Sequence, residues 1–388
     1  MSAGASGNGT AGLSGSALPS SSMRDRIHAV RDGWLENPDF QRLCSSLPLT
    51  RQIANRQAKR LFDLCAGFVY SQILAACVQL ELFKHLRNGP LSARELSVRM
   101  SVREDAAMRL LRAAVSLDLV ERRSGGRFGL GMMGAAFNGN PAIAGMIRHH
   151  AMLYRDLSDP VALLRGEVRT ELSRYWAYAD PERENPLEGD DVAAYSALMV
   201  SSQALIADDV LSAYSFGKHR CLLDIGGGEG AFVAAAAKRH RNLRFKLFDL
   251  PAVARRAHLH FSRENLADRA EAFGGSFLTD SLPRGADIVS LVRVLHDHDD
   301  ASVMTILRAA RDALPDGGVI LVAEPLAGTP GAEAMGDGYF GFYLLAMGQG
   351  RPRTAKELSE MLERAGFSSV RRRSTRSPLL TGVLTACR

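Results

Sequence analysis

Residues 222–230, with the sequence LLDIGGGEG, constrain the fold more than any other part of the chain. The apolar first half is typical of a parallel strand buried on both faces, since such strands are nearly continuous in apolar residues. Glycines at 226, 228 and 230 then permit a tight turn and a close backbone approach to a ligand. The alanine-rich residues 231–238 continue as a helix. Together these features predict a nucleotide-binding edge on an open α/β sheet.

Acidic residues around this turn narrow the class of ligand. The nicotinamide pattern is G-x-G-x-x-G, and here the third glycine comes one residue early. Asp224 places a carboxylate where it suits an amino-acid ammonium or a sulfonium. Asp249 follows the strand-like residues 243–248, close to the roughly 20-residue spacing of a carboxylate that binds ribose hydroxyls. A flavin- or nicotinamide-type turn and a merely structural turn remain the alternatives at this stage.

Length and composition favour a two-domain globular protein. The 388 residues are 46% hydrophobic, enough for two cores. The serine- and glycine-rich start predicts a disordered tail over residues 1–24, without the basic and apolar blocks of a secretion signal. No unbroken run of 18 apolar residues is present, so no membrane span is expected. Five scattered cysteines without a C-x-x-C indicate a reducing, cytoplasmic location.

The net charge of +6 is diffuse, with basic clusters at 51–60 and 371–373. A solvated face is the favoured interpretation, and no nucleic-acid partner is expected. Peripheral contact with an anionic inner-membrane surface is the alternative that such an excess of positive charge allows.

Residues 25–165 are predicted to form a mostly helical winged-helix domain. Apolar residues spaced by three and four over 61–83 predict a long helix. Two S-x-x-E capping boxes, starting at Ser92 and Ser101, each predict a short helix. The strand-like residues 119–121 and 127–130 flank a glycine turn and predict a β-wing.

A winged helix suggests DNA binding, which requires several side chains that reach base edges and phosphates. Arg103, Arg109 and Arg112 are available, but Glu104 and Asp105 lie among them. The apolar helix before them resembles an interface helix. We therefore favour a dimerisation module, and a ligand-sensing winged-helix regulator is the alternative from another class.

Residues 166–388 alternate between strand and helix patterns, which predicts a doubly wound, Rossmann-like α/β domain. The predicted core strands are 221–225, 243–248, 287–292 and 318–323. The predicted helices are 231–239, 251–258, 300–313 and 354–365. Two edge strands are predicted near 368–374 and 380–386.

Two of these strands end in candidate catalytic residues. His296 follows one strand and Glu324 ends the next, so both side chains are expected at the ligand-binding edge of the sheet. A carboxylate beside an imidazole fixes its tautomer and raises its basicity, as a general base requires. The alternatives are that His296 and Asp297 cap the following helix, or that residues 296–300 bind a metal. Consecutive residues on a turn rarely converge on one ion, so no metal is expected.

The order of these motifs resembles a known family. The winged helix, LLDIGGGEG, FDLP, GGSF, RVLHDHDD and AEP occur in the order found in small-molecule O-methyltransferases that use S-adenosyl-L-methionine. That family includes the plant caffeate and flavonoid enzymes and acetylserotonin O-methyltransferase. The resemblance spans about residues 60–388. It implies a class I methyltransferase domain, an N-terminal dimerisation domain, a homodimer and S-adenosyl-L-methionine as cofactor.

The resemblance also assigns roles to residues. His296 is implied as proton acceptor and Glu324 as its orienting carboxylate. The implied cofactor-binding residues are Asp224, Gly226, Gly228, Gly230, Asp249, Leu250, Gly275, Ser276, Phe277 and Arg293.

Three positions depart from the family pattern. Ser276 stands where the family has Asp, and His298 stands where it has Trp. Pro352 replaces the second carboxylate of the G-x-E-R-T segment, so Glu324 is expected to act alone.

A narrower resemblance concerns residues 145–150, 159–166 and 338–348. These segments are similar to the carotenoid hydroxyl O-methyltransferases of purple photosynthetic bacteria. Those enzymes methylate the tertiary hydroxyl of 1-hydroxy acyclic carotenoids such as demethylspheroidene and hydroxyneurosporene. The implied function is therefore in carotenoid biosynthesis for photosynthesis. Methylation of an aromatic or polyketide metabolite, or of a tetrapyrrole, is the alternative.

The apolar and aromatic residues 335–347 suit a lipophilic polyene substrate, although ordinary core packing explains such a pattern equally well. The predicted substrate-pocket residues are Met199, Met335, Tyr339, Phe342, Tyr343 and Met347.

Overall fold

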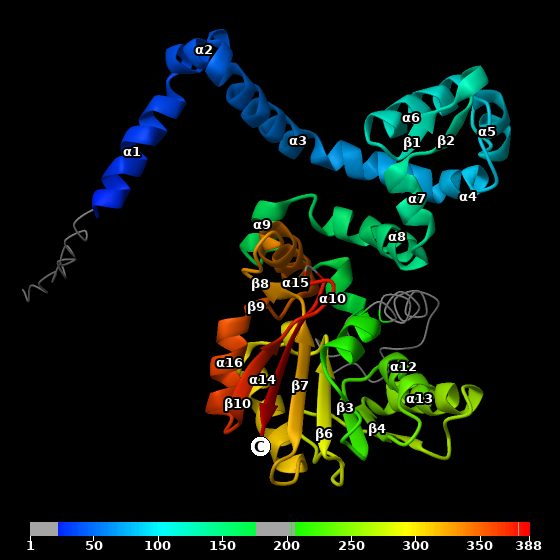
Figure 1. Cartoon of the computed structure of the whole chain (residues 1–388), viewed down its shortest axis with the longest axis vertical. Coiled ribbons are helices and arrows are strands. Elements are labelled where there is room, and N and C mark those ends of the chain that lie inside the picture. Colours follow the sequence, from blue (N-terminus) through cyan, green and yellow to red (C-terminus); the bar gives the residue numbers. More distant parts are fainter. Residues whose placement is uncertain (1–21, 176–202, 204–205, 379) are drawn as a thin grey trace, which may run out of the picture. The chain divides into compact units, whose positions relative to one another are not determined.

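The computed structural model describes residues 22–175, 203, 206–378 and 380–388 (Figure 1). The chain divides into two compact units, Met1–Ile73 and Leu74–Arg388. The predicted domain boundaries at 24/25 and 165/166 stay predictions.

The first unit contains α1 (Met23–Glu36), α2 (Pro38–Ser46) and most of α3 (Pro48–Gln79). A capping box between Ser22 and Asp25 starts α1, so the helix begins within the last residues of the expected tail. Residues 1–21 lie outside the described part of the chain. Helix α3 begins well before the predicted residue 61 and includes the basic residues 51–60. It ends just before Glu81, whose positive φ of 53° separates it from α4 (Leu82–Leu86).

Helix α3 is long and apolar enough to cross a membrane, judged by length and composition only. The sequence did not predict this helix as a membrane span, because Asp63, Ser71 and Gln72 interrupt its apolar residues. Only 17% of its most apolar window is buried, and Phe62, Leu64 and Phe68 are exposed. Such a helix is weak evidence for a membrane span, since an interface helix has the same composition.

The winged helix is confirmed and belongs to the second unit. It comprises α5 (Ala93–Arg99), α6 (Glu104–Ser116), β1 (Val120–Arg122), β2 (Phe128–Leu130) and α7 (Met132–Asn138). The Ser92–Glu95 capping box is present as predicted. The box predicted at Ser101 is wrong, because Ser101 has a φ of 55° and Arg103 takes the N-cap position of α6. Strands β1 and β2 pair antiparallel as the wing.

Three helices follow the winged helix in the chain, before the sheet begins. They are α8 (Pro141–Asp156), α9 (Pro160–Leu164) and α10 (Glu171–Tyr175). The side chains of α8 and α10 pack with α15 (Gly341–Met347) in a small apolar cluster that contains Leu153, Leu172 and Leu344.

The second unit is centred on a seven-stranded sheet in the order β10-β11-β7-β6-β3-β4-β5 (Figure 1). Its parallel strands are β3 (Cys221–Ile225), β4 (Arg244–Asp249), β5 (Ala270–Gly274), β6 (Ile288–Val292) and β7 (Val319–Glu324). The strands β10 (Ser368–Arg373) and β11 (Gly382–Cys387) run antiparallel to their neighbours. The four predicted core strands are confirmed to within one residue at each end.

The edges of the sheet differ from the prediction. Strand β11 is not an edge strand, because it lies between β10 and β7 and is almost wholly buried. The arginine-rich β10 forms that edge, where most of its side chains are exposed to water. The opposite edge is β5, which the sequence pattern missed because only part of its short run is apolar.

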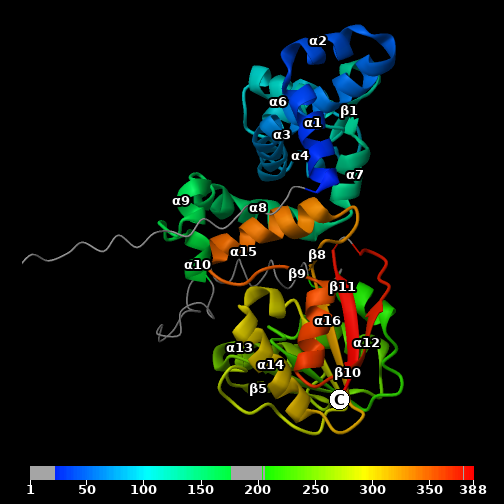
Figure 2. The same cartoon turned by 90° about the vertical axis from the view of Figure 1, so that its left-hand side faces the viewer.

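Helices cover both faces of the sheet (Figures 1 and 2). One face packs against α12 (Ala231–Arg239) and α13 (Pro251–Arg263). The other packs against α14 (Asp300–Ala313) and α16 (Ala355–Arg364). Alternate strand residues supply the two cores, for example Leu222 on one face and Leu223 on the other. Strand order reverses direction between β3 and β6, the position where such sheets bind ligands at their carboxyl edge.

Short elements at this carboxyl edge carry the remaining candidate residues. They are η2 (Leu295–Asp297), β8 (Leu326–Ala327), the π-helix η3 (Ala334–Phe340) and β9 (Arg353–Thr354). The predicted helical face over 335–347 is therefore split between η3 and α15. π-Helical turns of this kind occur frequently at functional sites.

Candidate active site

The glycine-rich turn after β3 has the backbone that its sequence predicts. Gly226, Gly228 and Gly230 have φ of 66°, 58° and 85°. A Cβ on Gly226 would lie 2.8 Å from Val294, and one on Gly230 would lie 2.4 Å from Phe261. A Cβ on Gly228 would meet nothing within 4 Å, so space next to this residue is open. Glycine is favoured here because of the positive φ rather than because of a close contact.

Asp224 lies directly before this turn and is 1% exposed. Its Oδ1 accepts a 2.6 Å hydrogen bond from the Ser290 hydroxyl, whereas its buried Oδ2 has no partner among the described residues. Burial raises the pKa of Asp224 to about 7, an effect that the Ser290 hydrogen bond opposes and nearby Asp249 reinforces. A buried acceptor without a donor is costly, so this oxygen suits a ligand ammonium.

Asp249, at the end of β4, connects to the same turn. Its Oδ2 accepts the Gly228 amide at 2.8 Å, and its Oδ1 accepts the Leu250 amide at 2.7 Å. A carboxylate oxygen can accept two hydrogen bonds, so these contacts still allow Asp249 to accept hydrogen bonds from ribose hydroxyls. The structure thus brings the two predicted carboxylates to one turn.

The residues predicted along the adenine lie on the next loop and strand ends. Gly275 donates its amide to the Asp249 carbonyl at 2.9 Å, and Arg293 follows β6 with a φ of 57°. Ser276, which departs from the family pattern, donates its amide to the Asp280 carboxylate at 2.8 Å. The sequence analysis did not predict this carboxylate, because Asp280 lies four residues after Ser276, the position where the family pattern has Asp.

Phe277 is buried and contacts His298, the second departure from the family pattern. Their ring centroids are 5.3 Å apart at 85°, an edge-to-face arrangement. The imidazole of His298 therefore supplies an aromatic contact where the family has an indole, and burial lowers the pKa of His298.

His296 is buried in η2 between two carboxylates. Its Nδ1 donates to Oε2 of Glu324, as the strand ends predicted. The Glu324 Oε1 accepts the Val294 and Leu295 amides at 3.0 and 2.7 Å, which fixes the carboxylate. The Nε2 of His296 lies 3.1 Å from Oδ1 of Asp297. Besides Glu324, a second carboxylate that the sequence analysis did not expect therefore lies against the ring, because the neighbouring Asp297 folds back onto it. The prediction that Glu324 acts alone in catalysis stays a prediction.

These carboxylates set the protonation of His296. Burial by itself lowers the pKa of the ring, but Asp297 and Glu324 outweigh it and raise the pKa to about 10. The imidazolium therefore predominates at neutral pH in the ligand-free protein, and the neutral base increases as the pH rises.

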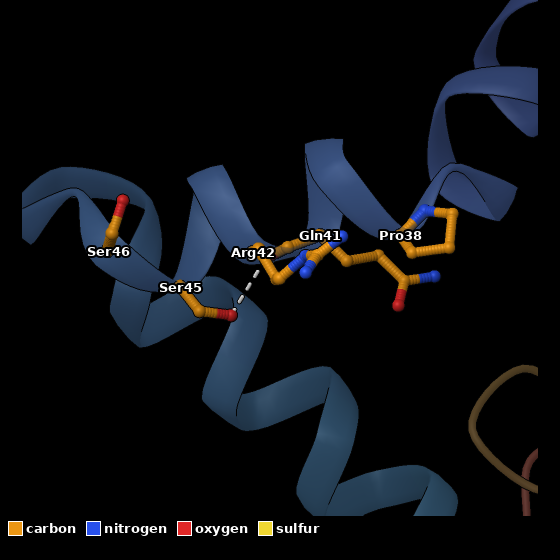
Figure 3. Close-up of a pocket in the computed structure, with 5 residues that line it drawn as sticks. All are labelled: Pro38, Gln41, Arg42, Ser45 and Ser46. Carbon is orange, nitrogen blue, oxygen red and sulfur yellow. Dashed lines mark hydrogen bonds between the residues drawn. The ribbon is translucent and has the colours of Figure 1, made fainter.

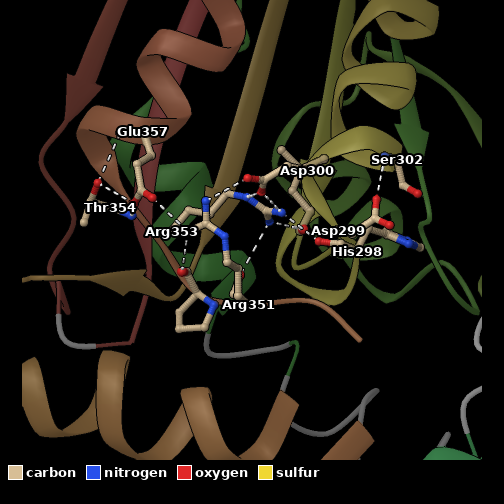
Figure 4. Close-up of polar contacts among 10 residues, drawn as sticks. His298, Asp299, Asp300, Ser302, Arg351, Arg353, Thr354 and Glu357 are labelled. Atoms are coloured by element: carbon tan, nitrogen blue, oxygen red, sulfur yellow. Dashed lines mark hydrogen bonds and ion pairs between the residues drawn. The ribbon is translucent and has the colours of Figure 1, made fainter. Parts of the chain in front are cut away.

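A buried arginine anchors the loop that carries His296 (Figure 4). Arg353 of β9 donates to the carbonyls of Leu295 and His298, each at 2.7 Å, which bracket His296. It also pairs with Asp300 at 2.6 Å, and the more exposed Arg351 binds the other Asp300 oxygen at 3.0 Å. The sequence analysis did not predict a role for Arg353, although this residue lies directly after Pro352, which it had singled out.

The predicted substrate-pocket residues occupy different environments. Tyr339 and Tyr343 are partly buried, Met335 is partly exposed, and Met347 packs in the cluster with Leu344. Phe342 is 38% exposed, and Met199 lies outside the described residues. Phe340, which the sequence analysis did not select, has its ring centroid 6.3 Å from that of His296.

A separate hollow of about 560 Å³ lies in the first unit, lined by α2 residues that include Pro38, Arg42 and Ser45 (Figure 3). It contains none of the candidate catalytic or cofactor-binding residues, and open hollows on polar helix surfaces are common.

Comparisons with known proteins agree with this site. A family model described as the O-methyltransferase domain matches residues 154–368, and one described as the O-methyltransferase dimerisation domain matches residues 62–138. The dimerisation match begins within α3 and ends with the last residue of α7. Exposed apolar residues of α3 such as Phe62, Leu64 and Phe68 therefore lie in the segment that matches the dimerisation domain.

Relatives extend over nearly the whole chain. Demethylspheroidene O-methyltransferase of Cereibacter sphaeroides is 40% identical over 90% of this chain and 92% of its own. The enzyme of the same name from Rhodobacter capsulatus is 39% identical over 88% and 84%. The crystal structure of the S-adenosylmethionine-dependent methyltransferase SibL matches 85% of this chain and 98% of its own, with a TM-score of 0.72 and 25% identity.

The sheet, the glycine-rich turn and the acidic strand ends define a class I methyltransferase with an N-terminal dimerisation domain. More narrowly, the chain belongs to the S-adenosylmethionine-dependent O-methyltransferase family.

Proposed function

We propose that this enzyme transfers the methyl group of S-adenosylmethionine to the tertiary hydroxyl of a 1-hydroxy acyclic carotenoid. The 40% identity to demethylspheroidene O-methyltransferase is the single observation that carries the substrate class. The partly buried aromatic residues of η3 and α15 near His296 support it, because a conjugated hydrocarbon packs well against aromatic rings.

The proposed cofactor site follows from the carboxyl edge of the sheet. Asp224 Oδ2, which is buried without a hydrogen-bond partner among the described residues, binds the methionine ammonium, and Asp249 binds the ribose hydroxyls. Gly226, Gly228 and Gly230 admit the cofactor against the backbone, and Leu250, Gly275, Ser276, Phe277 and Arg293 surround the adenine. When bound, S-adenosylmethionine would supply an electrophilic methyl group, which the acceptor oxygen would attack in line with the departing thioether sulfur.

His296 is the proposed general base. Its neutral Nε2 would accept the hydroxyl proton as the oxygen–carbon bond forms and the carbon–sulfur bond breaks, which requires Asp297 Oδ1, 3.1 Å from that nitrogen, to make room for the acceptor hydroxyl. Glu324 holds Nδ1, and both Glu324 and Asp297 stabilise the resulting imidazolium. A tertiary alcohol is a weak acid, so proton removal accompanies methyl transfer. Alignment in a dry site supplies most of the rate, and the base adds about 10²–10⁴-fold.

The same evidence supports a proposed assembly and location. The dimerisation domain favours a homodimer, and a cytoplasmic enzyme fits a chain without paired cysteines among its described residues. Peripheral membrane contact remains a prediction, consistent with a lipophilic substrate.

The direct test supplies purified protein with methyl-labelled S-adenosylmethionine and demethylspheroidene or hydroxyneurosporene. We expect a labelled methyl ether, identified by mass. A panel of phenolic metabolites serves as the comparison. Efficient labelling of a phenol with none of the carotenoid would replace the proposed acceptor by an aromatic one while leaving the O-methyltransferase assignment intact.

A further inference from the structure

Two histidine–tyrosine pairs join α8 to the segment that carries Phe340. His149 Nε2 lies 2.9 Å from the Tyr343 hydroxyl, and His150 Nε2 lies 2.8 Å from the Tyr339 hydroxyl. The partners are almost 200 residues apart in sequence, and all four side chains are partly buried. Ordinary packing of two helices does not require two adjacent pairs of the same kind.

The tyrosines belong to a continuous series of aromatic rings that starts at His296. The Phe340 ring stands edge-on to the His296 ring, and 5.1 Å separates the Phe340 and Tyr339 centroids. Tyr339 and Tyr343 then stack at 5.9 Å with an angle of 22°. The series therefore leads away from the proposed base along one side of η3 and α15.

The protonation states keep this series neutral. Burial lowers the pKa of both histidines, that of His149 to about 4, so the imidazoles are uncharged at physiological pH. Burial also raises the pKa of Tyr339 to about 12, so it remains a phenol. A neutral imidazole has one donor and one acceptor nitrogen, and either can pair with a phenol hydroxyl. Each hydroxyl is thereby paired with an imidazole, so the part of each ring that stays exposed is mainly apolar.

We propose that His149 and His150 are positioning residues for acceptor selectivity. By holding Tyr339 and Tyr343 in this orientation, they form a wall that takes the conjugated chain of the acceptor while its hydroxyl end reaches His296. The inference rests on the proposed function and adds to it the part of the site that recognises conjugation. Phenol rings that turned their hydroxyls to the acceptor would instead favour a polar substrate.

The test compares two acceptors that share the same hydroxyl end. One is demethylspheroidene, and the other is an analogue of equal length with a saturated chain. In the His150→Leu and His149→Leu variants, we expect KM for demethylspheroidene to rise about tenfold, the effect of one lost hydrogen bond, with kcat nearly unchanged. The KM for the saturated analogue should stay within about twofold of wild type, since it gains little from aromatic faces.

Two further measurements separate positioning from folding. The Tyr154→Phe variant is the matched control, since Tyr154 lies on α8 beside His150 but its hydroxyl has no hydrogen bond among the described residues. The Tyr339→Phe variant keeps the ring and tests the hydroxyl alone. Cofactor affinity, measured by calorimetry, should be unchanged in all of these variants.

The possible outcomes separate failure of this inference from failure of the proposed carotenoid O-methyltransferase function. A wild-type enzyme that methylates no carotenoid overturns both. If wild type methylates demethylspheroidene but the leucine variants lose both acceptors equally, or lose neither, the histidines are structural only and the wall is rejected. A loss confined to the conjugated acceptor supports the proposal even if the variants melt at a lower temperature.

Discussion

The glycine-rich turn after β3 and the loop that carries His296 after β6 lie at the ends of adjacent strands, but different kinds of contact hold them in place. The glycine turn takes its shape from consecutive residues of one strand–turn–helix unit, and three positive φ values within five residues define it. The loop around His296 is held by residues from three other segments: Glu324 on β7, Phe340 on η3 and Arg353 on β9. One region is determined locally and the other by distant contacts.

This difference predicts which measurements will respond to substitution. Changes at the turn should alter cofactor affinity, because the backbone and Asp224 belong to the proposed cofactor site. Changes at the loop should alter turnover and its pH dependence while cofactor affinity is kept. Each prediction below separates these two responses.

The largest effect is expected for His296→Ala. Removal of the base should lower kcat by about 10²–10⁴-fold and leave the Kd for S-adenosylmethionine within about twofold. The matched control is His258→Ala on the exposed side of α13, which should keep full turnover. Near wild-type kcat in His296→Ala would show that another group accepts the proton.

Asp224→Asn should weaken S-adenosylmethionine binding by about 10- to 100-fold, the loss of a charged hydrogen bond. The ordinary pKa of an aspartate is lower than the value of about 7 in this site. The Asp224 side chain is therefore mostly a neutral carboxylic acid below about pH 7 and mostly a carboxylate above it. The affinity of the wild-type enzyme for S-adenosylmethionine should consequently rise as the pH increases through about 7. Calorimetry across that range should show the rise in wild type and not in Asp224→Asn. The same pH dependence in both proteins would exclude Asp224 as its source.

Arg353→Lys should reduce kcat by about tenfold, because an ammonium cannot donate to both bracketing carbonyls and to Asp300 in the fixed geometry of a guanidinium. Cofactor affinity should not change. Arg351→Lys is the control, since its ion pairs are more exposed and contribute little. Equal effects of the two substitutions would mean that Arg353 does not specifically hold the loop.

The smallest change is expected for Asp297→Asn, as a shift in the pH profile. In wild type the carboxylates raise the pKa of His296 to about 10, so kcat/KM should increase with pH up to that region. Loss of one carboxylate lowers this pKa, so the variant should reach its plateau at lower pH. Rates measured from pH 6 to 10.5 test this, and an unmoved profile would mean that Asp297 does not act on His296.

Local patterns account for most of what could be predicted. The core strands, the turn and the Ser92 capping box depend on short-range periodicity and backbone preference, and the structure has them where they were expected. The capping box at Ser101 failed because the same four-residue pattern also fits a turn before the helix. Strand β5 was missed because an edge strand need not be continuously apolar.

The site shows the same division. Asp224, Asp249, His296 and Glu324 lie at one edge of the sheet, as expected, because the ends of parallel strands meet there whatever the loops do. Their roles stay predictions. Asp297 was considered only as a helix cap or a metal ligand, and its contact with the His296 ring was not predicted. Asp280 and Arg353 were missed because their partners are set by loop conformation.

By itself, the amino-acid sequence determined the α/β architecture, the winged helix and the glycine turn, since each depends on periodicity or backbone freedom within a short segment. The loop that carries the proposed base stays a prediction. The tertiary structure alone decided how that loop is held. The Glu324 carboxylate on His296, the buried arginine behind it and the histidine–tyrosine pairs beside Phe340 join residues from distant elements. Asp297 is a sequence neighbour of His296, and its contact with the ring depends on the conformation of the loop. These contacts depend on side-chain burial and hydrogen-bond geometry that exist only once the sheet and its helices have packed.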